Sequence, residues 1–282
     1  MRGRITILGA AVAALTALGT LTGQASGARA VDTSFSSVAL GGRLHYVVYL
    51  PAGYATSGLR YPVVYFLHGL PAASTSYRSV GFVERALDQK GRAAILVVPQ
   101  GARQGERDPE YVDHGPGDDW GTAIALELPH AIDSHFRTIP DRRGRALIGN
   151  SAGGYGAMHL ALRHLDRFAV VESWSGYFHP TDPTGTKPLS LGSPGRDARA
   201  DVHEQIAAAQ ARLRSQRLFI AFYVGRADTR FRAENVQLDR ELTAEGIPHV
   251  FRVFRGGHTL RLWREHAREW LGLALDHLSP AG

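Results

Sequence analysis

Short apolar runs and stretches of helical spacing alternate along the chain, and this pattern predicts its elements. Residues 44–51 (LHYVVYLP) alternate in polarity and are rich in Val and Tyr, as expected of a half-buried strand. Residues 61–69 (YPVVYFLHG) and 93–101 (AAILVVPQG) are continuous apolar runs closed by Gly or Pro, which is typical of strands buried on both faces. Residues 80–91 have helical spacing and end on glycine, so a strand, a helix and a strand follow one another here.

The same alternation continues to the C-terminus. We expect helices at 123–136, 153–165, 202–215, 232–246 and 260–278, and strands at 145–150, 168–174, 218–225 and 249–254. A repeating strand–helix unit predicts an α/β fold with a mainly parallel sheet flanked by helices on both faces. The chain has 282 residues, 44% of them hydrophobic, which suits a single domain.

Two segments interrupt this rhythm. Residues 102–119 and 178–200 are polar and rich in Pro and Gly, and each follows the carboxyl end of a strand. Ligands of open α/β sheets bind at that edge. The two segments therefore either form walls of a pocket or are surface loops without a role in binding. Whether residues 178–200 form a lid over the site stays open.

The N-terminus has the layout of a secretory signal peptide. Residues 1–4 are basic, residues 5–21 are apolar, and small or polar residues lead to Ala28-Arg29-Ala30. We expect cleavage after Ala30, which leaves 31–282 as a secreted domain without stable membrane insertion. The alternative is a membrane anchor that stays attached. The chain has no cysteine, so disulfides and thiolate catalysis are excluded.

Charge and composition exclude several kinds of partner. The net charge of +6 includes three arginines of residues 1–30, so the mature chain carries +6 − 3 = +3. The remaining arginines are scattered, which argues against a nucleic-acid interface. Asp113, His114, Asp118 and Asp119 cluster, but their spacing matches no standard ligand loop, so we predict a solvated turn and no metal.

Ser151 stands out as a candidate nucleophile. It lies in GNSAG (149–153), between a predicted strand and a predicted helix. A turn sharp enough to push a side chain above the sheet strains the backbone and leaves no room for neighbouring Cβ atoms, which explains Gly149 and Gly153. The backbone N–H groups at the start of the helix favour developing negative charge.

A serine hydroxyl needs a base, and the base needs an orienting acid. In hydrolases of this architecture the order along the chain is Ser, acid, His, each after a strand. Asp228 follows the strand at 218–225, and His258 follows the strand at 249–254. Glu234, early in the next helix, is the competing acid.

An oxyanion needs two backbone donors. The N–H of Ala152 is one, and the turn in LHGLP (67–71) should supply the other, for which Leu70 is the candidate. The alternative is that this turn only ends a strand.

Taken together, these residues resemble a known family. The matching pieces are VYLPAGY (48–54), FLHGL (66–70), Glu127-Leu128-Pro129, GNSAGGYGAMHLALRHLDRF (149–168), SWSGYF (173–178) and GGH (256–258) followed by Trp263. Over residues 40–278 the chain resembles the α/β-hydrolase family of esterase D (S-formylglutathione hydrolase), feruloyl esterases and mycolyltransferases.

The resemblance implies Ser151 as nucleophile, His258 as base, and Leu70 with Ala152 as oxyanion hole. It implies Asp228 as the acid, as in the feruloyl esterases, while the mycolyltransferase pattern keeps Glu234 open. Many members carry a bulkier residue and a methionine where Asn150 and Ala152 flank the serine here, so the pocket shape is expected to differ.

The predicted function is that of a secreted serine esterase without a cofactor, acting on small-molecule, glycolipid or polysaccharide esters. A secreted acyltransferase for envelope glycolipids and a catalytically silent binding protein are the alternatives. Trp120 and Trp263 could stack on the alcohol of the substrate, or simply pack under a loop.

Overall fold

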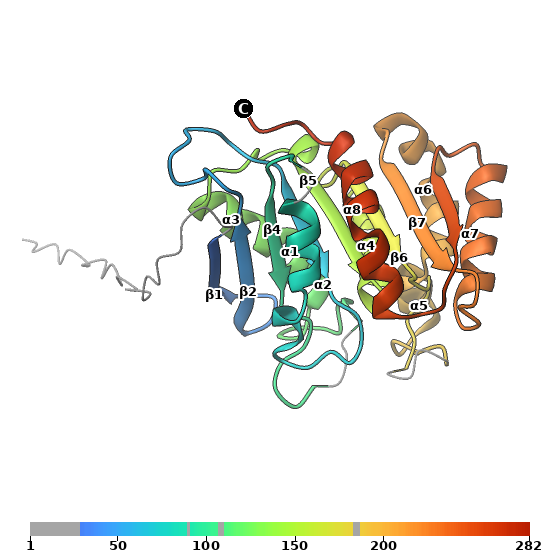
Figure 1. The fold of residues 1–282 in the computed structure, drawn as a ribbon. Helices are drawn as coiled ribbons and strands as arrows, with labels where there is room; N and C mark the ends of the chain where they lie inside the picture. Colours follow the sequence, from blue (N-terminus) through green and yellow to red (C-terminus); the bar gives the residue numbers. More distant parts are fainter. Residues whose placement is uncertain (1–28, 89–90, 107–109, 183–186) are drawn as a thin grey trace, which may run out of the picture.

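The fold is built on one eight-stranded sheet (Figure 1). The computed structural model describes residues 29–88, 91–106, 110–182 and 187–282. The strands are β1 (Arg29–Ser37), β2 (Gly42–Leu50), β3 (Val63–Leu67), β4 (Ile95–Pro99), β5 (Arg145–Asn150), β6 (Val170–Trp174), β7 (Phe219–Gly225) and β8 (Val250–Phe254).

The strand order is β1-β2-β4-β3-β5-β6-β7-β8. The pairs β1/β2 and β2/β4 are antiparallel, and the other five pairs are parallel. Strands β3, β4 and β5 are buried along their whole length, and for β3 and β4 their continuous apolar runs predict this. Because the strands from β3 to β8 are parallel, the loops after them gather at one edge of the sheet.

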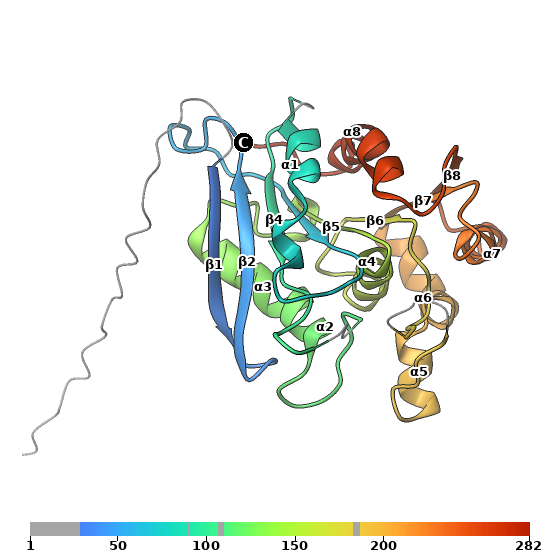
Figure 2. The ribbon, with the colours of Figure 1, turned by 60° about the horizontal axis from the view of Figure 1, so that its bottom comes forward.

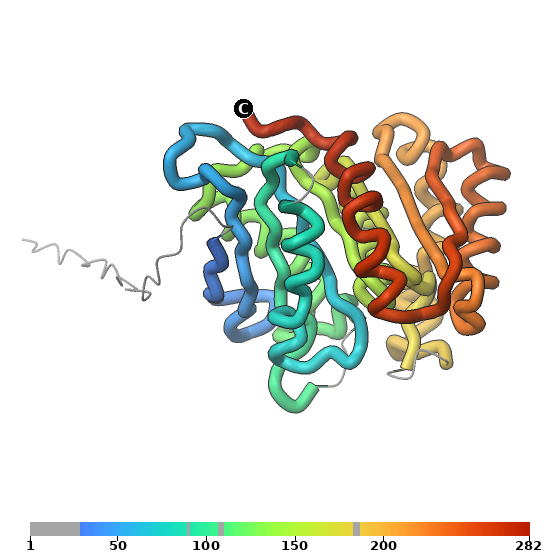
Figure 3. Tube along the Cα trace, in the orientation of Figure 1, coloured from blue at the N-terminus to red at the C-terminus, as the bar shows by residue number. Residues whose placement is uncertain are grey.

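Helices cover both faces of the sheet (Figures 1, 2 and 3). They are α1 (Gly81–Asp88), α2 (Trp120–Thr122), the π-helical turn Ala123–Glu127, α3 (Leu128–His135), α4 (Ala152–Arg163), α5 (Pro194–Ala200), α6 (Val202–Gln216), α7 (Arg232–Ala244), α8 (Leu260–Asp276), and two 3₁₀ turns at Ser76–Arg78 and Arg142–Gly144. Helices α1 and α8 share one apolar core with the sheet, and α3, α4, α6 and α7 share the other. The predicted α/β-hydrolase architecture is confirmed.

Three details differ from the sequence-based expectation. The first strand, β1, was not predicted, because RAVDTSFSS is mostly polar and only one of its residues is buried. Helix α5 lies inside the segment expected to be irregular, and Ser193 caps its start. The helix expected at 123–136 begins as a π-helical turn.

The predicted signal peptide lies almost wholly outside the described residues. Residues 1–28 are not described, and Arg29 and Ala30 open β1, where they pair with Leu50 and Tyr49. Among the described residues, no helix is both long enough and apolar enough to cross a membrane.

One carboxyl group lies in the centre of the sheet. Glu172, on β6, is completely buried. Trp174 Nε1 and the Tyr223 hydroxyl donate hydrogen bonds to its two oxygens, at 3.0 and 3.2 Å. Burial raises the pKa of Glu172 to about 8, although these two donors oppose the shift.

Candidate active site

The turn from β5 into α4 holds Ser151 in a strained conformation. Its φ is 55° and its ψ is −124°, a region that a residue with a side chain rarely adopts. A Cβ on Gly149 would lie 2.1 Å from the carbonyl oxygen of Gly153, and a Cβ on Gly153 would lie 2.0 Å from that of Leu67. The two glycines are therefore required for the turn, as the sequence pattern predicts.

Two backbone segments border this serine. A Cβ on Gly69 would lie 2.8 Å from Ser151 Cβ, so the turn after β3 lies directly against the serine. Ala152 is the first residue of α4, where N–H groups have no intrahelical acceptor. Among the described residues, no backbone acceptor is found for the N–H of Leu70 or Ala152.

Hydrogen bonds link Ser151, His258 and Asp228 in one chain. His258 Nε2 lies 2.9 Å from Ser151 Oγ, and His258 Nδ1 lies 2.9 Å from Asp228 Oδ2. The three residues follow β5, β8 and β7, whose ends lie at one edge of the sheet. Ser151 is 8% exposed, and the side chain of Asp228 is fully buried.

The surroundings of Asp228 keep it ionised. Burial alone would raise its pKa, but the hydrogen bond and charge interaction with His258 and the amides of Phe231 and Arg230 lower the pKa overall. An ionised carboxylate only accepts hydrogen bonds, so Nδ1 of His258 carries a proton and Nε2 presents a lone pair to Ser151.

Two aromatic rings pack against the imidazole edge to face. The ring of Phe231 lies 5.1 Å from that of His258 at an interplanar angle of 64°, and the ring of Trp263 lies 5.2 Å from it at 86°. Trp263 Nε1 donates to Ser175 Oγ at 3.2 Å, which ties the indole to the loop after β6. Trp263 thus contacts the site, whereas no motif in the sequence marked Phe231, which is only an apolar residue three positions after Asp228.

Glu234 is engaged away from His258. Its Oε1 accepts from His179 Nδ1 at 2.7 Å and from the Phe178 amide at 2.8 Å, and His203 lies 3.7 Å away. Burial would raise its pKa, but these donors lower it to about 2. The carboxylate that contacts His258 is that of Asp228.

The segment 102–119 supports the turn after β3 but does not expose Trp120. The Tyr111 hydroxyl donates to the carbonyl of His68 at 2.8 Å. Trp120 is 0% exposed and packs in the core, which agrees with the alternative that it packs under the loop. A side chain as fully buried as that of Trp120 has no exposed surface that a ligand could contact.

The acidic cluster of that segment holds its own loop together. Asp113 accepts from the amide and hydroxyl of Thr122, and Asp118 pairs with Arg103 at 2.7 Å. Asp119 accepts from the amide of Gly115. Within the described part of the chain, no group of three or more His, Cys, Asp or Glu is arranged to hold a metal ion.

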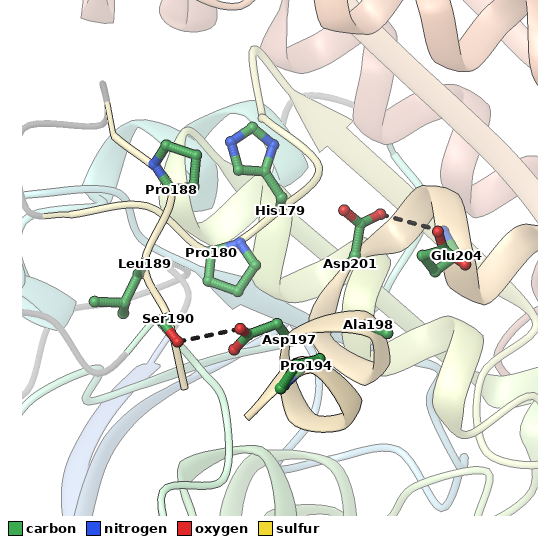
Figure 4. A pocket seen from close by; sticks show the side chains of 10 residues that line it. All are labelled: His179, Pro180, Pro188, Leu189, Ser190, Pro194, Asp197, Ala198, Asp201 and Glu204. Atoms are coloured by element: carbon green, nitrogen blue, oxygen red, sulfur yellow. Dashed lines mark hydrogen bonds between the residues drawn. The ribbon is translucent and has the colours of Figure 1, made fainter. Parts of the chain in front are cut away.

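The segment 178–200 borders a cavity of about 620 Å³ (Figure 4). Its walls include His179, Leu189 and Asp197, and helix α6 closes the opposite side. The Ser190 hydroxyl donates to Asp197 at 3.1 Å and so joins the residues before α5 to this helix, which forms the end of the same segment. His179, on this wall, is the residue that also binds Glu234.

Residues 37–269 match the family described as "Putative esterase". The chain belongs to this esterase family. The esterase Rv1288 of Mycobacterium tuberculosis (strain H37Rv) is 34% identical over 143 residues, which cover 50% of this chain and 31% of that relative. The chain therefore spans about a third of the length of this curated relative.

Solved structures agree with the fold of this chain. A ferulic acid esterase matches with a TM-score of 0.74 at 23% identity, covering 90% of this chain and all of the other. An S-formylglutathione hydrolase from Agrobacterium tumefaciens has the same TM-score at 20% identity, over 91% and 98% of the two chains. The resemblance to the esterase D and feruloyl esterase group is confirmed.

Proposed function

We propose that this esterase hydrolyses carboxylic esters with Ser151 as nucleophile, His258 as base and Asp228 as the acid that orients the base. The unbroken chain of hydrogen bonds between these side chains carries the proposal. A serine hydroxyl becomes an effective nucleophile at neutral pH only when a base takes its proton, and this base points its free lone pair at Oγ.

In the first half-reaction Ser151 Oγ attacks the ester carbonyl carbon while its proton moves to His258 Nε2. The carbonyl oxygen becomes an oxyanion, and the N–H groups of Leu70 and Ala152 stabilise it. The tetrahedral intermediate then collapses, the C–O bond to the alcohol breaks, and His258 returns the proton to the leaving alkoxide. The acyl group stays on Ser151.

In the second half-reaction water replaces the alcohol. His258 takes a proton from water as it attacks the acyl carbon, and Ser151 leaves with that proton. An alcohol in place of water would give acyl transfer by the same steps. We propose water as the acceptor, because the family and the related proteins reported above are esterases and a hydrolase.

The test is hydrolysis of short nitrophenyl esters by the purified mature chain. Ser151→Ala should lower kcat by up to about a million-fold. Ser215→Ala, an exposed serine on α6, is the matched control and should keep full activity. A Ser151→Ala enzyme as active as this control would refute the assignment.

Two further measurements separate the rival functions. A fluorophosphonate probe should label wild type and not Ser151→Ala, and an unlabelled wild type would indicate a silent binding protein. Product analysis with and without a sugar acceptor such as trehalose should yield free acid in both cases. An acylated sugar as main product would indicate an acyltransferase.

We further propose that the protein is exported and that residues 1–30 are removed on the way. The order of basic, apolar and small residues before Ala30 supports this proposal.

A further inference from the structure

Four exposed arginines, which we call the arginine rim, lie in the loops that carry the base and its acid and at the start of the helix that follows: Arg226, Arg230, Arg255 and, on α8, Arg261. The two loops lie side by side. The Arg226 amide donates to the carbonyl of Phe254 at 2.7 Å, in the turn where both strands end. The positive charges therefore gather at the edge of the sheet where His258 lies.

The arginine rim is not neutralised from within the protein. Across the described residues, none of its four guanidinium groups has a carboxylate within 4 Å, whereas Arg252, on β8, pairs with Glu269 at 2.8 Å. Arg226 and Arg255 directly follow Gly225 and Phe254, the last paired residues of β7 and β8, so their backbones are adjacent. Positive charges gathered on adjacent segments repel one another, and a bound anion would offset that repulsion.

A cavity of about 460 Å³ lies at the rim. The cavity is lined by Arg255, which precedes His258 in the chain, and by Thr259 and Arg261, which follow it. Of the carboxylates in the described ranges, Glu265 alone lines this cavity, and it lies more than 4 Å from the nitrogens of both arginines. Two guanidinium groups and a hydroxyl are the donors that oxyanions prefer.

One arginine of the rim is linked to the base through a shared aromatic neighbour. The guanidinium carbon of Arg230 lies 5.0 Å from the centre of the Phe231 ring, and that ring lies 5.1 Å from the imidazole of His258. In the proposed reaction His258 gives its proton to the departing alcohol, so the alcohol half of the ester must lie within hydrogen-bond reach of Nε2. Arg255 and Arg261 lie three residues before and three residues after His258 in the chain, so they belong to the loop and the helix start on either side of the base.

We propose that the arginine rim binds an oxyanion, a carboxylate or a phosphate, on the alcohol half of the ester, with Arg255 and Arg261 making the direct contacts. This inference rests on the proposed esterase function and adds the chemical class of its substrate. Arg226 and Arg230 add to the field that draws such substrates in, an effect that salt screens.

The experiment compares two esters that differ by one charge, 4-acetoxybenzoate and its neutral methyl ester. The measured quantity is the ratio of kcat/KM for the anionic ester to kcat/KM for the neutral one. Arg255→Gln/Arg261→Gln should lower this ratio about tenfold or more relative to wild type, because two charge-assisted contacts are lost. Dividing by the wild-type ratio removes the intrinsic difference in reactivity between the two esters.

The control removes the same charge elsewhere. Arg240→Gln/Arg268→Gln replaces two exposed arginines of α7 and α8 and should keep the wild-type ratio. A ratio that is equal in the rim variant and in this control overturns the inference while leaving the esterase function standing. A wild type that turns over neither ester overturns the proposed function itself.

The two oxyanions are then distinguished by inhibition of neutral-ester hydrolysis with benzoate and with phenyl phosphate. Inhibition that weakens in Arg255→Gln/Arg261→Gln supports the site, and the stronger inhibitor identifies the preferred group. Equal inhibition of wild type and the rim variant by both compounds contradicts it.

Discussion

Replacing Asp228 by Asn should invert the proton arrangement on His258. Asp228 Oδ1 accepts from the amides of Arg230 and Phe231, each at 3.2 Å, and Oδ2 accepts from His258 Nδ1. In the Asn variant the carbonyl oxygen remains with the two amides, because its NH₂ group cannot accept from them. The NH₂ group then faces the imidazole and donates to Nδ1.

This inversion leaves His258 with its proton on Nε2, where it can no longer take the proton of Ser151. The expected loss in kcat is about 10⁴-fold, as found for the same change in another serine hydrolase. At about 1.4 kcal/mol per decade this corresponds to roughly 5 to 6 kcal/mol of transition-state stabilisation. The assay is steady-state hydrolysis of a neutral nitrophenyl ester, with circular dichroism as a check that the variant is folded.

Glu234→Gln provides the comparison. Glu234 is bound by His179 and the Phe178 amide, so its replacement should change kcat by only a few fold. If Asn at position 228 kept more than a tenth of the activity while Gln at position 234 lost a thousand-fold or more, Glu234 would be the acid and the reasoning would be wrong.

Three further predictions concern the fold and its processing. Gly153→Ala should lower the free energy of unfolding by about 3 kcal/mol or more in a denaturant titration, because the new Cβ would collide with the carbonyl oxygen of Leu67. The control is Gly58→Ala, where a Cβ meets nothing within 4 Å. Equal stability of the two variants would contradict this prediction. The pKa of Glu172 is about 8 in the folded protein, which is above its value in the unfolded chain. Its contribution to the free energy of unfolding is therefore complete below about pH 4.5 and is lost as the pH rises to about 8. Over this window the free energy of unfolding falls by up to about 1.4 kcal/mol per pH unit. Glu172→Gln should therefore gain stability relative to wild type as pH rises over this window, and a constant difference would refute the buried-charge argument. N-terminal sequencing of the secreted protein should begin at Val31, and a retained leader would show that residues 1–30 are an anchor.

The order of elements was predictable because buried strands and amphipathic helices have different apolar periods. The runs at β3 and β4 are apolar throughout, and the positions of β3, β4 and β5 agree with prediction to within about two residues. Strand β1 escaped detection for the opposite reason. It pairs with one neighbour at the sheet edge, so its residues face solvent and carry no apolar signal.

The site was partly predictable for a topological reason. Parallel strands end at one edge, so a serine after β5, an aspartate after β7 and a histidine after β8 were expected to meet, and their side chains do. The direction of a side chain in a loop has no such rule. Trp120 and Phe231 are both buried aromatic residues near polar loops, but only Phe231 contacts His258. Only packing in three dimensions distinguishes them.

The bond between Ser151 and His258 joins residues 107 positions apart, and the histidine belongs to the last loop before the final helix. A nascent or partly folded chain consequently lacks the base, however complete its first half is. Under the proposed mechanism, such a chain has no base beside Ser151 and does not hydrolyse esters. The rate at which activity appears after dilution from denaturant is then expected to follow the docking of the C-terminal strands.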